Sequence, residues 1–134
     1  MAPEIDPAVA LIMAPDQIHW QNIGNGEDIA VLVGDPNKTG LYVTLVRWTA
    51  HHGGPAHFHP NDRYIVVLCG TFWVGTGRSC DPQNMIPVKA GSFVRYYANQ
   101  IRCDGAEDED TILEVVGQGP ANSPPVLPEL PWPL

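Results

Sequence analysis

The stretch HFHPNDRYIVVLCG, residues 57–70, decides the fold. Side chains at spacing two on an extended segment point to the same side, so His57 and His59 share one face. A turn-forming Pro-Asn-Asp follows, then an apolar run over 64–68, then Gly70, where the chain must bend again. Because a buried imidazole needs a partner for each ring nitrogen, the same-face pair predicts a functional site rather than an accident of packing.

Short apolar segments separated by turn residues continue on both sides of this stretch. No long segment has the 3.6-residue period of a helix, and turn signals recur about every eight to twelve residues, which is typical of an all-β sandwich or barrel. The expected strands are 29–33, 41–48, 64–68, 71–76, 92–97, 100–103 and 111–116, with a further strand carrying the two histidines, a loop over 77–89 and an exposed acidic turn over 104–110.

The order of residues around the histidines resembles the first motif of the cupin superfamily, G-x(5)-H-x-H-x(3,4)-E-x(6)-G. In that family the histidines and the glutamate bind a metal inside a small β-barrel. His57, His59 and Gly70 match the motif, whereas His51 stands at the first glycine and Arg63 at the glutamate.

The second cupin motif, G-x(5)-P-x-G-x(2)-H-x(3)-N, aligns on Gly91 in spacing but not in its key letters. The alignment puts Tyr97 at the proline, Asn99 at the second glycine, Arg102 at the histidine and Ala106 at the asparagine. The resemblance therefore implies the fold, a double-stranded β-helix or cupin jelly-roll barrel, and departs from the family at the metal-ligand positions.

The chain is long enough for one domain. We expect an N-terminal arm over 1–28 at a dimer interface, a cupin barrel over 29–119, and a proline-rich tail over 120–134 that is extended on the surface. A homodimer is expected because edge strands need covering and the apolar segment 9–13 has no obvious place in a monomeric barrel.

Composition excludes several classes of partner. A net charge of -8 argues against nucleic acid and anionic membranes, and no apolar run approaches the roughly 18 residues of a membrane helix. The acidic N-terminus does not resemble a secretory signal, so we expect a cytoplasmic protein. We expect three reduced thiols with Cys69 in the core, and a Cys80–Cys103 bridge is the alternative.

The charges at the ligand positions bear on whether a metal is bound. A unit positive charge about 5 Å from a dication costs on the order of 6 kcal/mol at an effective dielectric near 20, so Arg63 and Arg102 would oppose metal binding. The sequence thus favours a site without a metal cofactor. The alternative is a divalent transition metal (Fe, Mn, Zn or Ni) held by His57, His59 and Asp104 as a two-His-one-carboxylate site.

The arginines suggest that the barrel binds an anion, because four of the seven basic residues fall within or beside expected strands. The favoured hypothesis is an enzyme acting on a small anionic organic molecule by acid–base chemistry, of the isomerase, cyclase or dehydratase type. A metal-dependent cupin such as a dioxygenase and a non-catalytic ligand-binding cupin are the alternatives. The predicted catalytic residues are His57 or His59 as base, Arg63 or Arg102 to stabilise an enolate or carboxylate, and Tyr97, with Arg47, Arg95 and Tyr64 binding substrate.

Overall fold

The computed structural model describes residues 3–78, 80–123, 126 and 132–134. Within these residues the chain forms nine strands and two short 3-10 turns, and no helix there is long and apolar enough to span a membrane. The elements are η1 (Pro15–Gln17), β1 (Gln21–Gly24), β2 (Glu27–Val33), β3 (Gly40–Trp48), β4 (Arg63–Cys69), β5 (Thr71–Thr76), η2 (Pro82–Asn84), β6 (Ile86–Lys89), β7 (Phe93–Tyr96), β8 (Arg102–Ala106) and β9 (Thr111–Gly119).

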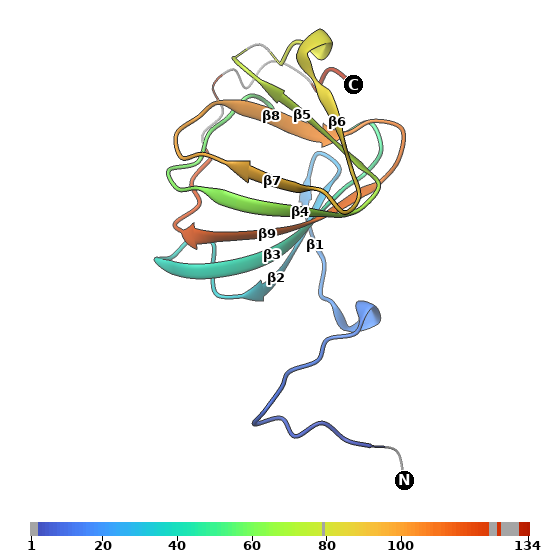
Figure 1. The fold of residues 1–134 in the computed structure, drawn as a ribbon, viewed down its shortest axis with the longest axis vertical. Helices are drawn as coiled ribbons and strands as arrows, with labels where there is room; N and C mark the ends of the chain where they lie inside the picture. Colours follow the sequence, from blue (N-terminus) through green and yellow to red (C-terminus); the bar gives the residue numbers. More distant parts are fainter. Residues whose placement is uncertain (1–2, 79, 124–125, 127–131) are drawn as a thin grey trace.

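The strands form two antiparallel sheets that enclose the core. The larger sheet has the order β1-β2-β3-β9-β4-β7 and the smaller has the order β6-β5-β8 (Figure 1). Strands β3 and β9 pair along their whole length, from Gly40↔Gly119 to Trp48↔Thr111. This arrangement confirms the predicted all-β barrel, and the crossings between the sheets are those of a jelly roll.

The core lies between the inner faces of the sheets. Tyr42, Val67, Phe72 and Val115 are almost completely buried and come from β3, β4, β5 and β9. Burial of such side chains stabilises each by roughly 1.5–3 kcal/mol relative to exposure. Directly opposite residues in an antiparallel pair share a face, so the strand register determines which other side chains face the interior with these four.

Both motif positions that depart from glycine keep the backbone that glycine would adopt. His51 has φ 66° and Asn99 has φ 64°, as left-handed as Gly70 at 76° and Gly91 at 90°. The left-handed region is sterically costly for most residues, and asparagine and histidine are enriched among those that tolerate it. The two motifs are thus preserved in backbone conformation where their letters have changed.

The C-terminal residues cover the outer side of the small sheet. Trp132 donates its indole N–H to the Ala106 carbonyl at 2.9 Å, and its ring fills a slot where a Cβ on Gly53 or Gly105 would collide with it. Val126 donates its backbone N–H to the Ala56 carbonyl at 2.7 Å. The rest of the expected tail beyond Ser123 lies outside the described residues, apart from the last two residues of the chain.

Several boundaries expected from the sequence are wrong. The expected loop 77–89 contains η2 and strand β6, whose proline is tolerated because β6 is an edge strand. The expected acidic turn 104–110 begins inside β8, where Asp104 is buried. The histidines lie on an extended segment with one bridge, His57↔Arg102, rather than on a strand. The first strand, β1, begins at Gln21, inside the range 1–28 that the sequence analysis assigns to the N-terminal arm.

The cysteines also differ from the expectation of three reduced thiols. Cys80 and Cys103 form a disulfide, which joins β8 to the loop before η2. Cys69 is exposed at the end of β4 rather than packed in the core. A β-bulge between Val67 and Cys69 shifts the register there and interrupts the inward alternation of β4.

Candidate active site

A backbone bridge brings the two motifs side by side inside the barrel. His57 and Arg102 exchange both backbone hydrogen bonds, N–H to carbonyl, at 2.9 and 3.0 Å. Side chains of directly opposite residues lie on the same face, so the His57 ring and the Arg102 guanidinium enter the same space. Strand β4 adds Arg63, which lies opposite Tyr96 of β7.

His57 has one ring nitrogen, Nε2, that lacks a hydrogen-bond partner among the described residues. Its Nδ1 lies 2.7 Å from the Pro55 carbonyl, which can only accept a hydrogen bond. In the neutral imidazole the proton is therefore on Nδ1, and Nε2 carries the lone pair. His57 is thus positioned to accept a proton at Nε2.

His59 has its lone pair engaged. Its Nε2 lies 2.8 Å from Nη1 of Arg63, and a guanidinium can only donate. The proton of the neutral His59 ring is therefore on Nδ1. This buried Nδ1 has no partner of hydrogen-bond geometry among the described residues, although the Ala121 carbonyl is near enough to act slightly on the His59 pKa. The two imidazoles meet edge to face with ring centroids 5.3 Å apart.

Arg102 is a buried cation whose hydrogen-bond donors find no acceptor within the described part of the chain. The residue is 2% exposed, and its guanidinium carbon lies 4.0 Å from the centre of the Tyr96 ring. Nε, Nη1 and Nη2 are all buried without a partner among the described residues. Asp104, the acceptor two residues along β8, instead receives the Tyr96 hydroxyl at 2.8 Å.

Unpartnered donors of this kind are rare in folded proteins, because burial of a cation without an acceptor is strongly unfavourable. Arg63 adds a fourth nitrogen, its Nε, that lacks a partner among the described residues. The arrangement provides donors for a planar anion in a space of low dielectric, where charge-assisted hydrogen bonds are strong.

The electrostatic environment keeps both histidines neutral. Burial is the main cause that lowers the pKa of His57, and the Arg102 and Arg63 charges lower it further, while Asp104 opposes the shift. The pKa of His59 falls to about 2, first through burial and then through Arg63 and Arg102. The sequence predicts this direction from the arginines alone, whereas burial has the larger effect.

Glu27 is a site residue that the sequence did not reveal. It lies opposite Trp48 in the β2–β3 register and so faces the interior. Burial, followed by repulsion from Asp104, raises its pKa to about 7, while Arg63 acts in the other direction. The sequence did hold one signal for this position: Glu27 stands two residues before the inward-facing Ile29, and side chains two apart on a strand lie on the same face.

Tyr96, and not the predicted Tyr97, faces the interior at this end of β7. Tyr96 is buried, and burial followed by the nearby Asp104 charge raises its pKa well above the ordinary value. Tyr97 is 61% exposed on the outside of the barrel. The error is one residue in an alternating pattern, which moves a side chain to the other face.

The three predicted substrate-binding residues also lie outside the barrel, which corrects that prediction. Arg47 donates from Nε and Nη2 to Asp28 at 3.0 and 2.8 Å and covers the Trp20 ring. Arg95 lies opposite Tyr64 on the outer face. The prediction that these side chains face the interior failed because knowing that a residue lies in a strand does not tell on which face of the sheet its side chain lies.

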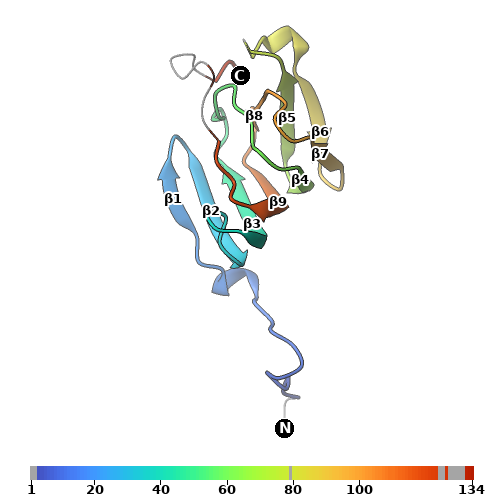
Figure 2. The same ribbon diagram turned by 90° about the vertical axis from the view of Figure 1, so that its left-hand side faces the viewer.

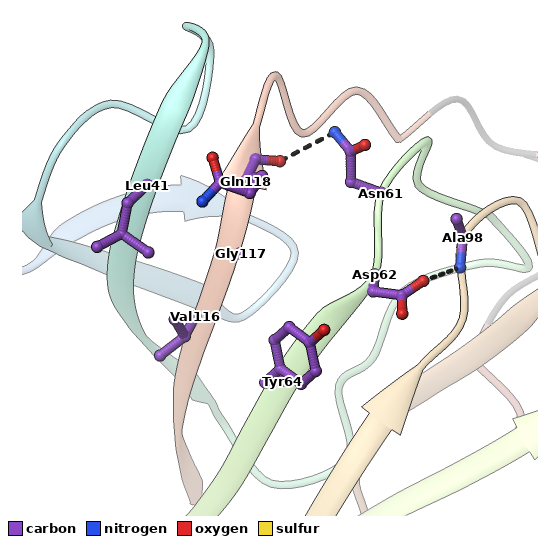
Figure 3. A pocket seen from close by; sticks show the side chains of 8 residues that line it. All are labelled: Leu41, Asn61, Asp62, Tyr64, Ala98, Val116, Gly117 and Gln118. Carbon is purple, nitrogen blue, oxygen red and sulfur yellow. Dashed lines mark hydrogen bonds between the residues drawn. The ribbon is translucent and has the colours of Figure 1, made fainter.

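A hollow of about 360 Å³ also lies on the outer face of the large sheet (Figure 3). Residues of β3 and β9, the start of β4 and the turn that precedes β8 line this hollow, and the two motif histidines do not. We therefore do not assign it to the interior site. Its lining residues are Leu41, Asn61, Asp62, Tyr64, Ala98, Val116, Gly117 and Gln118.

The interior residues do not fit the metal site of the resemblance. Arg63 occupies the His59 nitrogen that a metal would need, and Asp104 is engaged by Tyr96. Across the described ranges, no group of three or more His, Cys, Asp and Glu side chains is placed to hold an ion. The predicted set of His57, His59 and Asp104 is therefore not assembled as a ligand cluster.

Comparisons with known proteins agree with this small barrel of cupin type. A family model described as the ChrR cupin-like domain matches residues 9–122. The chain therefore belongs to the ChrR cupin-like family. No curated protein matches the sequence.

Solved structures share the fold at low sequence identity. KdgF from Halomonas sp. is 16% identical, with TM-score 0.65 over 81% of this chain and 94% of that one. The polyketide cyclase RemF from Streptomyces resistomycificus is 16% identical, with TM-score 0.68 over 87% and 82%. The DMSP lyase DddQ from Ruegeria pomeroyi DSS-3 is 16% identical, with TM-score 0.66 over 84% of this chain but only 62% of that one. These likenesses establish the jelly-roll fold.

Proposed function

We propose that this chain is an enzyme that binds a small organic anion inside the barrel and moves a proton on it, without an essential metal. The observation that carries this proposal is Arg102, which is 2% exposed and lies directly opposite His57 in a backbone bridge. All three of its guanidinium nitrogens lack a partner among the described residues. A carboxylate or enolate oxygen would supply the acceptor that this cation lacks.

In this proposal His57 is the general base. Its Nε2 takes a proton from a carbon next to the carboxylate or carbonyl of the substrate, and the electron pair of that C–H bond forms an enolate. Arg102 donates hydrogen bonds to the oxygen on which the negative charge develops, and this interaction is strong where water is excluded. The imidazolium then returns the proton to another atom of the product, or to a leaving hydroxide, which departs as water. The first outcome is an isomerisation, and the second is an elimination. In a ring closure the enolate carbon instead bonds to a carbonyl carbon of the same molecule, and the imidazolium protonates the alkoxide that this forms.

His59 and Arg63 have a positioning role in this proposal. The Arg63–His59 hydrogen bond of 2.8 Å fixes the guanidinium, and it withdraws the His59 lone pair from proton transfer. Arg63 Nε remains available to the anion. Of the two motif histidines, His57 alone keeps a ring lone pair without a hydrogen-bond partner among the described residues, so we assign the role of base to His57.

The known structures support the reaction class without specifying the substrate. Two of them are described as a polyketide cyclase and a DMSP lyase, so this fold carries ring-closing and eliminating enzymes. At 16% identity neither provides a substrate for this chain.

An assay that does not require the natural substrate to be known tests the proposal. The parent protein is incubated in D₂O with a panel of small 2-oxo and 3-oxo carboxylates, and ¹H NMR follows the loss of the C–H signal next to the carbonyl. We expect exchange that persists after treatment with a chelator and disappears in His57→Gln. The control variant His51→Asn, at an exposed histidine of the neighbouring turn whose left-handed backbone asparagine tolerates, should exchange like the parent.

Two results would refute parts of the proposal. Exchange lost on chelation and recovered with added iron, manganese, zinc or nickel would favour the metal-dependent alternative. Saturable binding of carboxylates by calorimetry with no exchange in any member of the panel would favour a ligand-binding cupin without catalysis.

A further inference from the structure

Glu27, the first residue of β2, is an interior acid to which the proposed reaction gives no role. It lies opposite Trp48 in the β2–β3 register, and Trp48 belongs to the buried core, so both side chains face the interior. Glu27 is half-buried, and its carboxyl group has no hydrogen-bond partner among the described residues. Because buried carboxyl groups are normally hydrogen-bonded, an exception of this kind indicates a functional role.

The turn between β1 and β2 is fastened to the segment that leads from β3 to His57. Asn25 donates its side-chain amide to the Gly53 carbonyl at 2.9 Å. The ring of His52 occupies the space in which a Cβ on Gly26 would lie. Figures 1 and 2 both show this turn at the end of the hairpin that points away from the N-terminus. The turn therefore places the start of β2, where Glu27 lies, beside the histidine segment.

A second set of contacts places Glu27 and His57 in the same part of the barrel. A Cβ on Gly54 would lie 3.8 Å from Cε1 of His57 and 3.9 Å from Cη2 of Trp48. The imidazole and the indole thus converge on one glycine. Since Trp48 lies directly opposite Glu27, the carboxyl group and the imidazole flank the same indole ring.

The environments of the two groups drive their pKa values in opposite directions. Burial has the largest effect on both pKa values, and Asp104 and Arg63 act on each of them as well. Burial raises the pKa of Glu27 to about 7, with Asp104 adding to the shift, whereas it lowers the pKa of His57. Near neutral pH, His57 is therefore unprotonated while a large share of Glu27 keeps its proton. Pairs of this kind divide the roles of base and acid between them.

We propose that Glu27 is the catalytic acid of this site, and that the substrate is an oxo acid whose hydroxyl group stands on the carbon next to the one that His57 deprotonates. This inference rests on the proposed function and adds to it the group that completes an elimination. The electron pair of the broken C–H bond forms the enolate and then the new C=C bond, and the C–O bond breaks. Glu27 gives its proton to the departing oxygen, which leaves as water. The imidazolium then loses its proton to solvent and the Glu27 carboxylate takes one up, so the net reaction is the loss of one water molecule.

A second group is required because His57 is fixed in one direction. Its Nδ1 lies 2.7 Å from the Pro55 carbonyl, which holds Nε2 toward the carbon that it deprotonates. Two neighbouring groups are poorer acids than Glu27. Asp104 accepts the Tyr96 hydroxyl at 2.8 Å, and burial raises the pKa of Tyr96 well above its ordinary value. Of these three groups, Glu27 alone combines an available proton near neutral pH with a carboxyl group that no described residue engages.

A matched pair of probes in D₂O separates removal of the carbon proton from departure of the hydroxyl group. 2-Oxopentanoate has only the exchangeable C–H next to the ketone, whereas 4-hydroxy-2-oxopentanoate carries a hydroxyl group on the next carbon. ¹H NMR follows exchange in both probes, and ultraviolet absorbance follows the conjugated product of water loss. Glu27→Gln should slow water loss by about 10²–10⁴-fold, the usual contribution of a general acid, and should change exchange of 2-oxopentanoate by less than about threefold.

Glu114→Gln is the matched control for this substitution. Glu114 is a half-buried glutamate of the same sheet, but it lies between Leu113 and Val115, whose side chains belong to the core, so its own side chain faces outward. Both rates should stay at the values of the parent.

A leaving group that needs no proton provides the second test. The fluorine of 4-fluoro-2-oxopentanoate is close to a hydroxyl group in size and departs as fluoride without being protonated. Glu27→Gln should therefore release fluoride within about threefold of the rate of the parent, although it has lost most of its water elimination. A structural role of Glu27 would slow both eliminations alike.

Four outcomes would overturn the inference. Water loss by Glu27→Gln at the rate of the parent, with exchange still dependent on His57, would exclude Glu27 as the acid and leave the proposed function intact. Exchange, water loss and fluoride loss that all fall together in Glu27→Gln would make Glu27 a structural residue. A parent that exchanges oxo carboxylates but releases no water from the hydroxylated probe would exclude this substrate class. No exchange by the parent with any oxo carboxylate would refute the proposed function, and this inference with it.

Discussion

An arginine, a tyrosine and an aspartate come together twice in this molecule, once outside the barrel and once inside it. In the outer group Arg95 donates from Nε and Nη2 to Asp62 at 3.0 and 2.6 Å, while its guanidinium lies 5.4 Å from the centre of the Tyr64 ring. The charges are paired and reached by solvent. The outer group is therefore complete without any ligand.

The inner group has the same residue types in a different order of contact. Arg102 lies over the ring of Tyr96, but Asp104 accepts the Tyr96 hydroxyl instead of the guanidinium. The guanidinium is left buried, with no acceptor for its donors among the described residues. When the aspartate accepts hydrogen bonds from the arginine, as outside the barrel, the cation is paired. When the aspartate accepts the tyrosine hydroxyl instead, as inside the barrel, the arginine is left with donors that a bound anion could accept.

The largest expected effect is on the rate of carbon-proton exchange, and it depends on the histidine that lies next to the inner group. His57 lies beside the inner group, and no histidine of the predicted site lies beside the outer one. His57→Gln should slow carbon-proton exchange by about 10²–10⁴-fold, the usual contribution of a general base. His59→Gln should slow it by about tenfold or less, because His59 only positions Arg63. Equal losses in the two variants, measured by the exchange assay, would contradict the distinction between them.

Anion affinity should differ between the two arginines. Arg102→Ala should weaken carboxylate binding by roughly 10–100-fold, because a charged hydrogen bond is worth about 1.5–3 kcal/mol. Arg95→Ala should leave the affinity unchanged. Isothermal calorimetry with the carboxylate that exchanges fastest measures both, and a weaker affinity in Arg95→Ala than in Arg102→Ala would reverse the comparison.

Stability should change in the sense opposite to binding. An unpaired buried cation destabilises a fold, so Arg102→Met should raise the free energy of unfolding by about 1–3 kcal/mol. Arg95→Met should give no such gain, because Arg95 is exposed and paired with Asp62. Urea denaturation followed by tryptophan fluorescence compares them. A destabilised Arg102→Met protein would mean that the contacts of the inner guanidinium, including its stacking on Tyr96, outweigh the cost of burying its charge.

The smallest expected effect, within any one pH unit, is on the pH dependence of the free energy of unfolding, to which Glu27 and the two motif histidines contribute. Glu27 has a pKa raised from 4.5 to about 7, so between these values the folded chain holds a proton that the unfolded chain releases, and stability falls as pH rises. His57 and His59 have lowered pKa values, so below pH 6.5 the unfolded chain takes up protons that the folded chain does not, and stability falls as pH drops. The two effects oppose each other between pH 4.5 and 6.5.

Glu27→Gln removes one of these opposing effects. Its free energy of unfolding should rise with pH across this window more steeply than that of the parent, by up to about 1.4 kcal/mol per pH unit. Asp62→Asn is the outer control, because the pKa of Asp62 is lowered from 3.8 by its hydrogen bonds to Arg95 and the Ala98 amide and therefore changes nothing in this window. Identical slopes for Glu27→Gln and the parent would exclude a half-buried, protonated Glu27.

Motif spacing predicts the part of the site that the backbone determines. His57, His59, Arg63 and Arg102 follow from the two motifs, and the structure places all four in the interior. Spacing is informative because the turns that set it keep their conformation, with left-handed residues at both altered glycine positions. The metal-opposing charge of the arginines is also visible in the sequence.

Phase and burial are not visible in the sequence. The motif alignment points to Tyr97 rather than Tyr96 because it assigns positions along the chain but not the face on which a side chain lies. Asp104 starts an acidic run, which predicts an exposed turn, yet pairing of β8 with β5 buries it. Glu27 falls in the predicted arm because a charged residue at the start of a strand gives no signal of facing inward.

Nitrogen-15 NMR of the arginine Nε–H groups tests the central claim most directly, because it observes the two arginines in one sample. Signals are assigned with Arg102→Lys and Arg95→Lys and followed during titration with a carboxylate shown by calorimetry to bind. The account predicts that the Arg102 Nε–H signal moves markedly and saturates with the binding curve, while the Arg95 signal stays in place. A saturating titration in which the Arg102 signal does not move would contradict the assignment of Arg102 as the anion-binding residue of the barrel.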